Sequence, residues 1–216
     1  ITKKAKNVAF GLIGLGALLT IIGVAVSASD HHFTTRLLAS GLISGFFFFA
    51  LGLGALFFLA LKYATETGWY AAIKRVIEAV AGFLPFGMII LGVVLLVITF
   101  MDGAHIYTWM DPEVQAHDEM VRHKAAYLNP IFFWIRTIAY FTTYFLFWRG
   151  FKNRSLEEDR VGGTELHFKN YKRGALFLVF FAVFSSTSAW DWIMSVDVHW
   201  FSTLFGWYTF AGMWCS

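Results

Sequence analysis

The sequence predicts an all-α membrane protein, a polytopic bundle of about six transmembrane helices. Of its 216 residues, 58% are hydrophobic and 14% are charged, and the mean hydropathy is +0.62. Soluble domains carry far more charge. The apolar runs are long enough to cross a hydrocarbon core of about 30 Å. Because alternating strand patterns are absent, these runs are predicted to be helices rather than the strands of a barrel.

We expect a single transmembrane domain over residues 1–216. Its predicted spans cover approximately residues 8–27, 37–61, 79–100, 130–148, 174–196 and 200–216. The last run is shorter than the roughly 20 residues that a spanning helix needs, so we expect the chain to be truncated at its C-terminus. Pro85 lies in the first turns of the third span, where it either kinks the helix or takes a position in which its missing donor is harmless.

Glycines in the first two spans predict close helix packing. They are Gly11, Gly14, Gly16, Gly23, Gly41, Gly45, Gly52 and Gly54. Most of the tryptophans fall near predicted membrane interfaces, where we expect them to act as aromatic anchors. The tryptophans interpreted in this way are Trp69, Trp109, Trp148, Trp190, Trp192 and Trp200.

The basic residues predict the orientation of the chain. The N-terminus and the second and fourth loops hold thirteen Lys and Arg residues, against three in the first, third and fifth loops. The positive-inside rule therefore predicts a cytoplasmic N-terminus. Although the sequence pI is about 9.0, these charges sit in short loops between apolar runs. We therefore expect membrane lipids as partners and no nucleic acid.

Two charged residues lie inside predicted spans. Arg136 is six residues below Pro130, a depth of about 9 Å, and Asp191 is five residues before Val196, a depth of about 7–8 Å. Intramembrane charges are costly unless they are paired or functional. Because consecutive antiparallel helices are usually neighbours, we expect Arg136 and Asp191 to form an ion pair.

Hydroxyl, carboxylate and imidazole groups extend this polar feature into a predicted proton path. Residues at helical spacing from the two charges could relay hydrogen bonds towards the membrane centre, and Ser195 shares the face of Asp191. Carboxylates and histidines at the outer face suit proton release or uptake. The candidate path comprises Asp191, Arg136, Tyr140, Thr143, Tyr144, Thr187, Ser188, Asp102, His105, Asp197 and His199. A buried pair that only fixes helix register is the alternative.

The sequence predicts that this chain binds no cofactor or metal of its own. Its one cysteine, Cys215, allows neither a CxxCH haem attachment nor a cysteine-ligated iron–sulfur cluster. All seven histidines lie in loops or at helix ends, whereas a b-type haem needs paired axial histidines within helices. HExxH and Walker motifs are absent.

The stretch SSTSAWDWIMSVDVHWFSTLFGWYTFAG, from Ser185 to Gly212, resembles a signature of the F membrane subunit of bacterial alternative complex III. That subunit belongs with the NrfD and polysulfide-reductase type membrane proteins. The residues 46–65, 68–85 and 124–141 agree with the same family. One departure is Val198, which stands where the family signature has proline.

The resemblance implies a subunit of about ten helices, of which the first six are present, in the bacterial inner (cytoplasmic) membrane. It also implies a respiratory quinol:cytochrome c oxidoreductase in which this chain is a non-catalytic scaffold with a proton path or a quinone-adjacent site. The implied partners are a paralogous NrfD-like membrane subunit and outward-facing subunits that carry c-haem and iron–sulfur clusters. A quinone is expected in the complex.

Two other functions fit the same residues. A secondary transporter would use Asp191 and Arg136 as a coupling site, although transporters favour broken helices near the midplane in repeated halves. A purely structural membrane anchor would need the pair only for packing.

Overall fold

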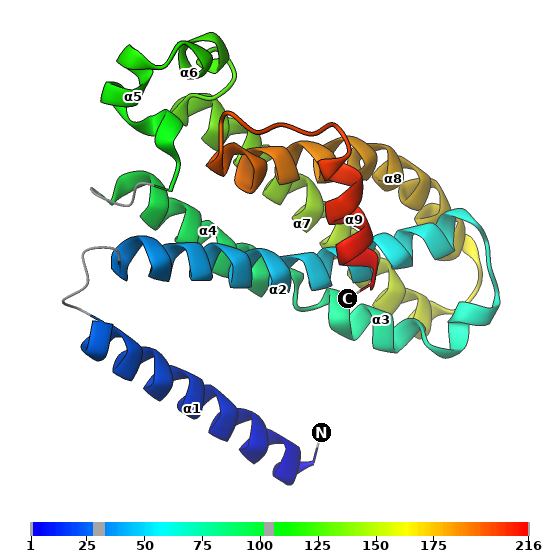
Figure 1. Ribbon diagram of the computed structural model, residues 1–216. Helices are drawn as coiled ribbons and strands as arrows, with labels where there is room; N and C mark the ends of the chain where they lie inside the picture. Colours follow the sequence, from blue (N-terminus) through cyan, green and yellow to red (C-terminus); the bar gives the residue numbers. More distant parts are fainter. Residues whose placement is uncertain (1, 28–32, 102–105, 216) are drawn as a thin grey trace.

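The computed structural model describes residues 2–27, 33–101 and 106–215, and every regular element in these ranges is helical (Figure 1). The predicted all-α class is confirmed for this part of the chain. The α-helices are α1 (Lys3–Ser27), α2 (Phe33–Ala64), α3 (Lys74–Ala81), α4 (Leu84–Phe100), α5 (Pro112–His117), α6 (Glu119–Lys124), α7 (Pro130–Val161), α8 (Glu165–Trp192) and α9 (Phe205–Cys215). Short 3-10 turns are η1 (Trp69–Ala72), η2 (Thr108–Met110) and η3 (Met194–Val196).

Within the described ranges, five helical segments are long and apolar enough to cross a membrane, which supports a multi-pass membrane protein. They are Lys3–Val26, Phe33–Ala64, Lys74–Phe100, Pro130–Val161 and Glu165–Val196. α7 and α8 extend well past the predicted spans 130–148 and 174–196 at the end where they are joined. Charged residues such as Glu and Arg are good helix formers, so hydropathy marks the apolar part of a helix rather than its end.

The predicted sixth span starts later than expected. α9 begins at Phe205 instead of Trp200, because residues before it form turns. Asp197 Oδ1 accepts hydrogen bonds from the backbone N–H groups of His199 and Trp200, at 3.0 and 3.3 Å. A carboxylate that binds successive backbone amides in this way stabilises a turn and competes with helix.

The third predicted span is interrupted after Ala81. The chain turns at Gly82 and Phe83, and α4 restarts with Pro85 in its first turn. The first N–H groups of a helix have no intrahelical acceptor, so proline costs nothing there. Of the two roles predicted for Pro85, the harmless position is the one observed.

α2 lies at the centre of the bundle, against α4 and α8. A Cβ added at Gly52 would lie 2.8 Å from the Leu84 Cα, and one added at Gly174 would lie 2.8 Å from the Ala60 carbonyl oxygen. Any side chain at these positions would therefore force the backbones apart. Close packing at the α2 glycines is confirmed.

The same prediction is wrong for α1. Figure 1 shows α1 apart from the other helices, and a Cβ added at any of its four glycines would meet nothing within 4 Å. Its described side chains are exposed throughout. A small residue permits close approach but supplies no attraction of its own, so these glycines do not by themselves bring α1 to a neighbour.

We call the end of the α7–α8 pair near Pro130 and Val196 the Pro130 end, and the opposite end the Val161 end. At the Val161 end, α3 is tied to α7 by ion pairs. Lys74 Nζ lies 2.8 Å from Glu158 Oε2, and Arg75 contacts Asp159. Two basic residues expected only as topology signals therefore also hold helices together.

Candidate functional site

Arg136 of α7 and Asp191 of α8 form the predicted ion pair at the Pro130 end. Arg136 Nε donates to Asp191 Oδ2 at 2.7 Å, and Nη2 donates to Oδ1 at 2.8 Å. The Asp191 side chain is fully buried and that of Arg136 is 10% exposed. This two-point contact matches the planar fork of arginine to a carboxylate, so the pairing prediction is confirmed.

Neighbouring groups hold both charges in place. Tyr140, one helical turn from Arg136, donates its hydroxyl to Asp191 Oδ2 at 2.9 Å. Arg136 Nη1 donates to the Tyr127 carbonyl oxygen at 3.0 Å. The guanidinium carbon also lies 3.9 Å from the Tyr127 ring centre and 4.4 Å from that of Phe132. Both oxygens of Asp191 are thus engaged by protein groups, and two aromatic rings lie against the cation.

The C-terminal end of α8 is fixed by side chains of which sequence reasoning identified only Ser195 as part of the polar feature. Trp192 Nε1 donates to Thr137 Oγ1 at 3.1 Å, and the Tyr107 hydroxyl donates to the Trp192 carbonyl oxygen at 2.7 Å. Ser195 Oγ donates to the Asp191 carbonyl oxygen at 2.5 Å. The last carbonyls of a helix lack intrahelical partners, which is why these donors collect there.

The tryptophans near this site are partly misassigned by the sequence. Trp192 and Trp109 are fully buried, so their interpretation as membrane-interface anchors is wrong. Trp192 packs edge-to-face on Phe49 and Tyr140, with ring centres 5.5 and 5.7 Å apart. The signal available in the sequence was that Trp192 directly follows Asp191 and Thr137 directly follows Arg136, on two helices already expected to be neighbours.

The predicted hydroxyl relay towards the membrane centre is continuous only as far as Tyr140 in the described residues. Thr187 and Ser188 donate to carbonyl oxygens of their own helix, at 2.9 Å to Val183 and 3.2 Å to Ser185. Hydroxyls inside helices commonly make this local bond. Tyr144, one turn beyond Tyr140, is buried, and its hydroxyl lies near Ser188 without forming a hydrogen bond of normal geometry. Thr143 lines a separate groove towards the Val161 end.

The cluster predicted at the outer face is arranged differently from the prediction. Asp197 binds backbone amides, and His199 Nε2 lies 2.7 Å from Oδ2 of Asp118, a residue that sequence reasoning missed. Asp118 caps α6 by accepting from the Met120 N–H at 2.9 Å. Partial desolvation acts to raise the pKa of Asp118, but the amide bonds and His199 outweigh it and lower that pKa. Asp102 and His105 lie outside the described residues.

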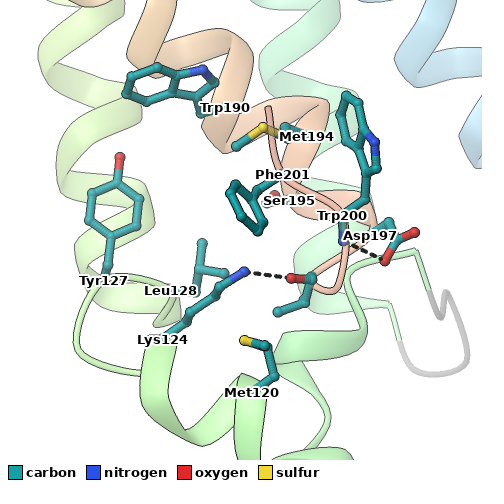
Figure 2. Close-up of a pocket in the computed structure, with 11 residues that line it drawn as sticks. Met120, Lys124, Tyr127, Leu128, Trp190, Met194, Ser195, Asp197, Trp200 and Phe201 are labelled. Carbon is teal, nitrogen blue, oxygen red and sulfur yellow. Dashed lines mark hydrogen bonds between the residues drawn. The ribbon is translucent and has the colours of Figure 1, made fainter. Parts of the chain in front are cut away.

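An apolar pocket of about 470 Å³ adjoins the ion pair at the Pro130 end (Figure 2). Tyr127 and Ser195 line this pocket and also contact the pair. Lys124 Nζ donates to the Val198 carbonyl oxygen at 2.6 Å, which closes one wall. Burial, and to a lesser extent the nearby Asp191 charge, raises the pKa of Tyr127 to about 12. Its phenol therefore stays protonated at neutral pH. The other lining residues are Met120, Leu128, Trp190, Met194, Asp197, Trp200 and Phe201.

Among residues 2–27, 33–101 and 106–215, no group of three or more His, Cys, Asp or Glu side chains is placed to hold a metal ion. No protein-family model matches the chain, and no curated protein matches it significantly.

Proposed function

We propose that this chain is an integral membrane subunit of a respiratory quinol:cytochrome c oxidoreductase of the alternative complex III type. It would lie in a bacterial cytoplasmic membrane with its N-terminus inside. The resemblance of residues 185–212 to that family supports the proposal. The observation that carries it is the buried Arg136–Asp191–Tyr140 cluster, which adjoins an apolar pocket through Tyr127.

The cluster can take up or release a proton if the two-point contact opens. While Arg136 binds both oxygens of Asp191, the two opposite charges are paired inside the protein. Rotation of Arg136 away from Asp191 would leave a buried, unpaired carboxylate, which favours protonation. Tyr140 would then keep its hydrogen bond to Oδ2 and hold the acid in position. Proton occupancy of Asp191 is thereby linked to the position of Arg136.

The pocket is suited to a ring with an apolar body and a polar edge. Its volume of about 470 Å³ falls in the range of small-molecule sites, roughly 300–1,000 Å³. The Tyr127 phenol, protonated at neutral pH, can donate a hydrogen bond to a carbonyl. A quinone in this pocket would be separated from the Arg136 guanidinium by the Tyr127 ring. Redox cofactors would belong to partner subunits: a paralogous NrfD-like membrane subunit and subunits with c-haem and iron–sulfur clusters.

A structural role for the cluster is the second candidate, and a specific observation favours it. The hydrogen-bond path ends at Tyr140, because Thr187 and Ser188 bond within their own helix and the Tyr144 hydroxyl is unpaired. A pair without a path would fix the register of α7 and α8 and move no proton.

Asp191→Asn distinguishes the two roles. Asparagine retains the size and one acceptor of the side chain, so the fold is expected to persist. In the complex reconstituted into vesicles, we expect quinol-dependent turnover and proton release to fall by about a hundredfold or more, the scale of a lost acid–base group. Tyr144→Phe is the matched control, because this buried hydroxyl has no hydrogen-bond partner. Unchanged turnover and proton release in Asp191→Asn would establish the structural role instead.

Membrane sidedness is tested separately. Cys215 is the single cysteine of the chain, so a Cys215→Ser background allows one labelled position at a time. We expect a membrane-impermeant maleimide added outside the cell to label a cysteine that replaces exposed Glu113 and not one that replaces Lys4. The opposite pattern would reverse the proposed orientation.

A further inference from the structure

A second cavity lies between α7 and α8 at the Val161 end. Its volume is about 380 Å³, and it contains two arginines, Arg154 of α7 and Arg173 of α8. Its other walls are mainly apolar. The cavity shares no lining residue with the pocket beside Asp191, so it forms a distinct site.

Arg154 is held in a defined position at this cavity. Its Nε donates to Asn170 Oδ1 at 2.6 Å, and Asn170 is fully buried. The guanidinium folds back along α7 over Gly150, where an added Cβ would lie 3.1 Å from Nη2. Asn170 and Gly150 therefore orient Arg154, while its terminal Nη groups remain available at the cavity.

The two arginines carry positive charge that no nearby acid balances. Arg173 is close enough to Arg154 for their charges to repel. In the described ranges, neither forms an ion pair with a carboxylate. Of the acids on the neighbouring turn of α7, Glu158 and Asp159 contact Lys74 and Arg75 instead, and Glu157 forms no ion pair with either arginine. Two guanidinium groups converging without a counter-ion create a strong preference for an anion, and phosphate matches their geometry.

The position along the helix places these arginines at a membrane surface. Arg154 lies eighteen residues beyond Arg136 on α7, a distance of about 27 Å along the axis. Because Arg136 is already about 9 Å below Pro130, Arg154 lies near the far edge of a hydrocarbon core of about 30 Å. Trp148 and Lys152, with the ammonium 5.0 Å from the ring centre, are typical of the same interface.

Apolar walls lead from the arginines back towards the membrane centre. Leu146, Leu176 and Phe180 line this part, and their side chains are exposed rather than packed in the core. The positively charged end of this cavity matches the phosphate headgroup of a phospholipid, and its apolar part matches an acyl chain. A soluble anion would use the first part and leave the second unoccupied.

We propose that this groove binds an anionic phospholipid, with its phosphate on Arg154 and Arg173 and an acyl chain along Leu146, Leu176 and Phe180. The two positive charges favour a lipid with net negative charge over a zwitterionic one. The site is independent of the proton or structural role of Asp191.

Lipid binding to the intact purified complex tests the proposal. After delipidation, phosphatidylglycerol or phosphatidylcholine is titrated and the retained lipid is counted by native mass spectrometry. We expect the wild type to prefer phosphatidylglycerol by about tenfold, and Arg154→Gln/Arg173→Gln to lose this preference. The matched control, Lys152→Gln/Arg160→Gln, removes the same charge from α7 outside the groove and is expected to keep the preference.

Further variants separate loss of binding from loss of folding. Arg173 is exposed, so Arg173→Gln alone is expected to fold normally and to weaken phosphatidylglycerol binding. Leu176→Trp should block the apolar part of the cavity, where the acyl chain would lie, while both arginines remain. Equal loss in the control pair would assign the effect to general surface charge and overturn the proposal. So would a wild-type complex without a lipid preference, as expected if a partner subunit's carboxylate neutralised the arginines.

Discussion

The two ends of the α7–α8 pair both contain a partly buried arginine, but only one end supplies a carboxylate to neutralise it. At the Pro130 end, one arginine meets one aspartate, and every polar atom of the carboxylate has a partner within the chain. At the Val161 end, Arg154 and Arg173 repel each other, and among the described residues the neutral Asn170 is the only side chain to which Arg154 donates a hydrogen bond.

The difference reflects the depth at which each group lies. Arg136 and Asp191 are inside a predicted span, where an unpaired charge is costly, so the protein supplies both members of the pair. Arg154 lies near a membrane surface, where water or a lipid phosphate can supply the missing anion. We call the Arg136–Asp191 pair the closed site, because its charges neutralise each other within the chain. The Arg154–Arg173 pair can instead bind an anion from outside the chain.

The largest expected effect comes from breaking the closed site. Arg136→Leu leaves Asp191 buried without a counter-ion, and we expect the free energy of unfolding to fall by about 3–5 kcal/mol. Arg136→Leu/Asp191→Leu should recover most of that loss, because neither charge is then stranded. Unfolding in mixed micelles, analysed as a double-mutant cycle, measures the coupling. Additive losses would mean that the two charges do not interact.

A smaller effect is expected from the hydroxyl that completes the pair. Tyr140→Phe removes a hydrogen bond to the ionised Asp191 and should lower the free energy of unfolding by about 1.5–3 kcal/mol. Tyr144→Phe is the matched control, because this hydroxyl is buried without a partner and its removal should leave stability unchanged or raise it. The same unfolding assay compares them. Equal losses of stability in Tyr140→Phe and Tyr144→Phe would contradict the hydrogen bond between Tyr140 and Asp191.

Glycines near the Val161 end provide a third comparison. Gly174→Ala places a Cβ 2.8 Å from the Ala60 carbonyl oxygen, a backbone atom that cannot move aside. We expect a loss of about 1–2 kcal/mol after the helix propensity of alanine is counted. At Gly150 the nearest atom is the movable Arg154 guanidinium, so Gly150→Ala should alter phosphatidylglycerol preference with little change in unfolding. A reversed order of stability losses would contradict this packing.

The smallest effect concerns pH and the contact between His199 and Asp118. The folded state lowers the pKa of Asp118, so its contribution to stability is fully present above the unfolded value of about 3.9 and is lost as the pH falls through the lowered folded value. The protection of the Met120 and Val121 amides against hydrogen exchange, relative to a free peptide at the same pH, should fall in that acid range. Asp118→Asn should remove most of this pH dependence. A loss of protection that persists in Asp118→Asn would assign the titration to another group.

The pair of Arg136 and Asp191 could be predicted from the sequence because both parts of the argument are local. Each charge interrupts an apolar run, and counting residues from the nearest helix end gives its depth. Asp118 could not be predicted as the partner of His199, because the two residues lie 81 positions apart in surface segments without periodicity. The hydrogen-bond partners of the Thr187, Ser188 and Tyr144 hydroxyls could not be predicted either. A hydroxyl at helical spacing can bond to its own helix as easily as to a neighbour.

The helical class, the apolar segments and the two opposite charges at matching depth all follow from the order of the amino acids along the chain. These are properties of single segments, and the cost of placing polar groups in hydrocarbon fixes them before any helix meets another. Tertiary structure alone decided that the polar path ends at Tyr140 and that Arg154 and Arg173 face one groove. Partners for polar side chains depend on the rotation of each helix against its neighbours, and that rotation is set by close contacts such as those of Gly52 and Gly174.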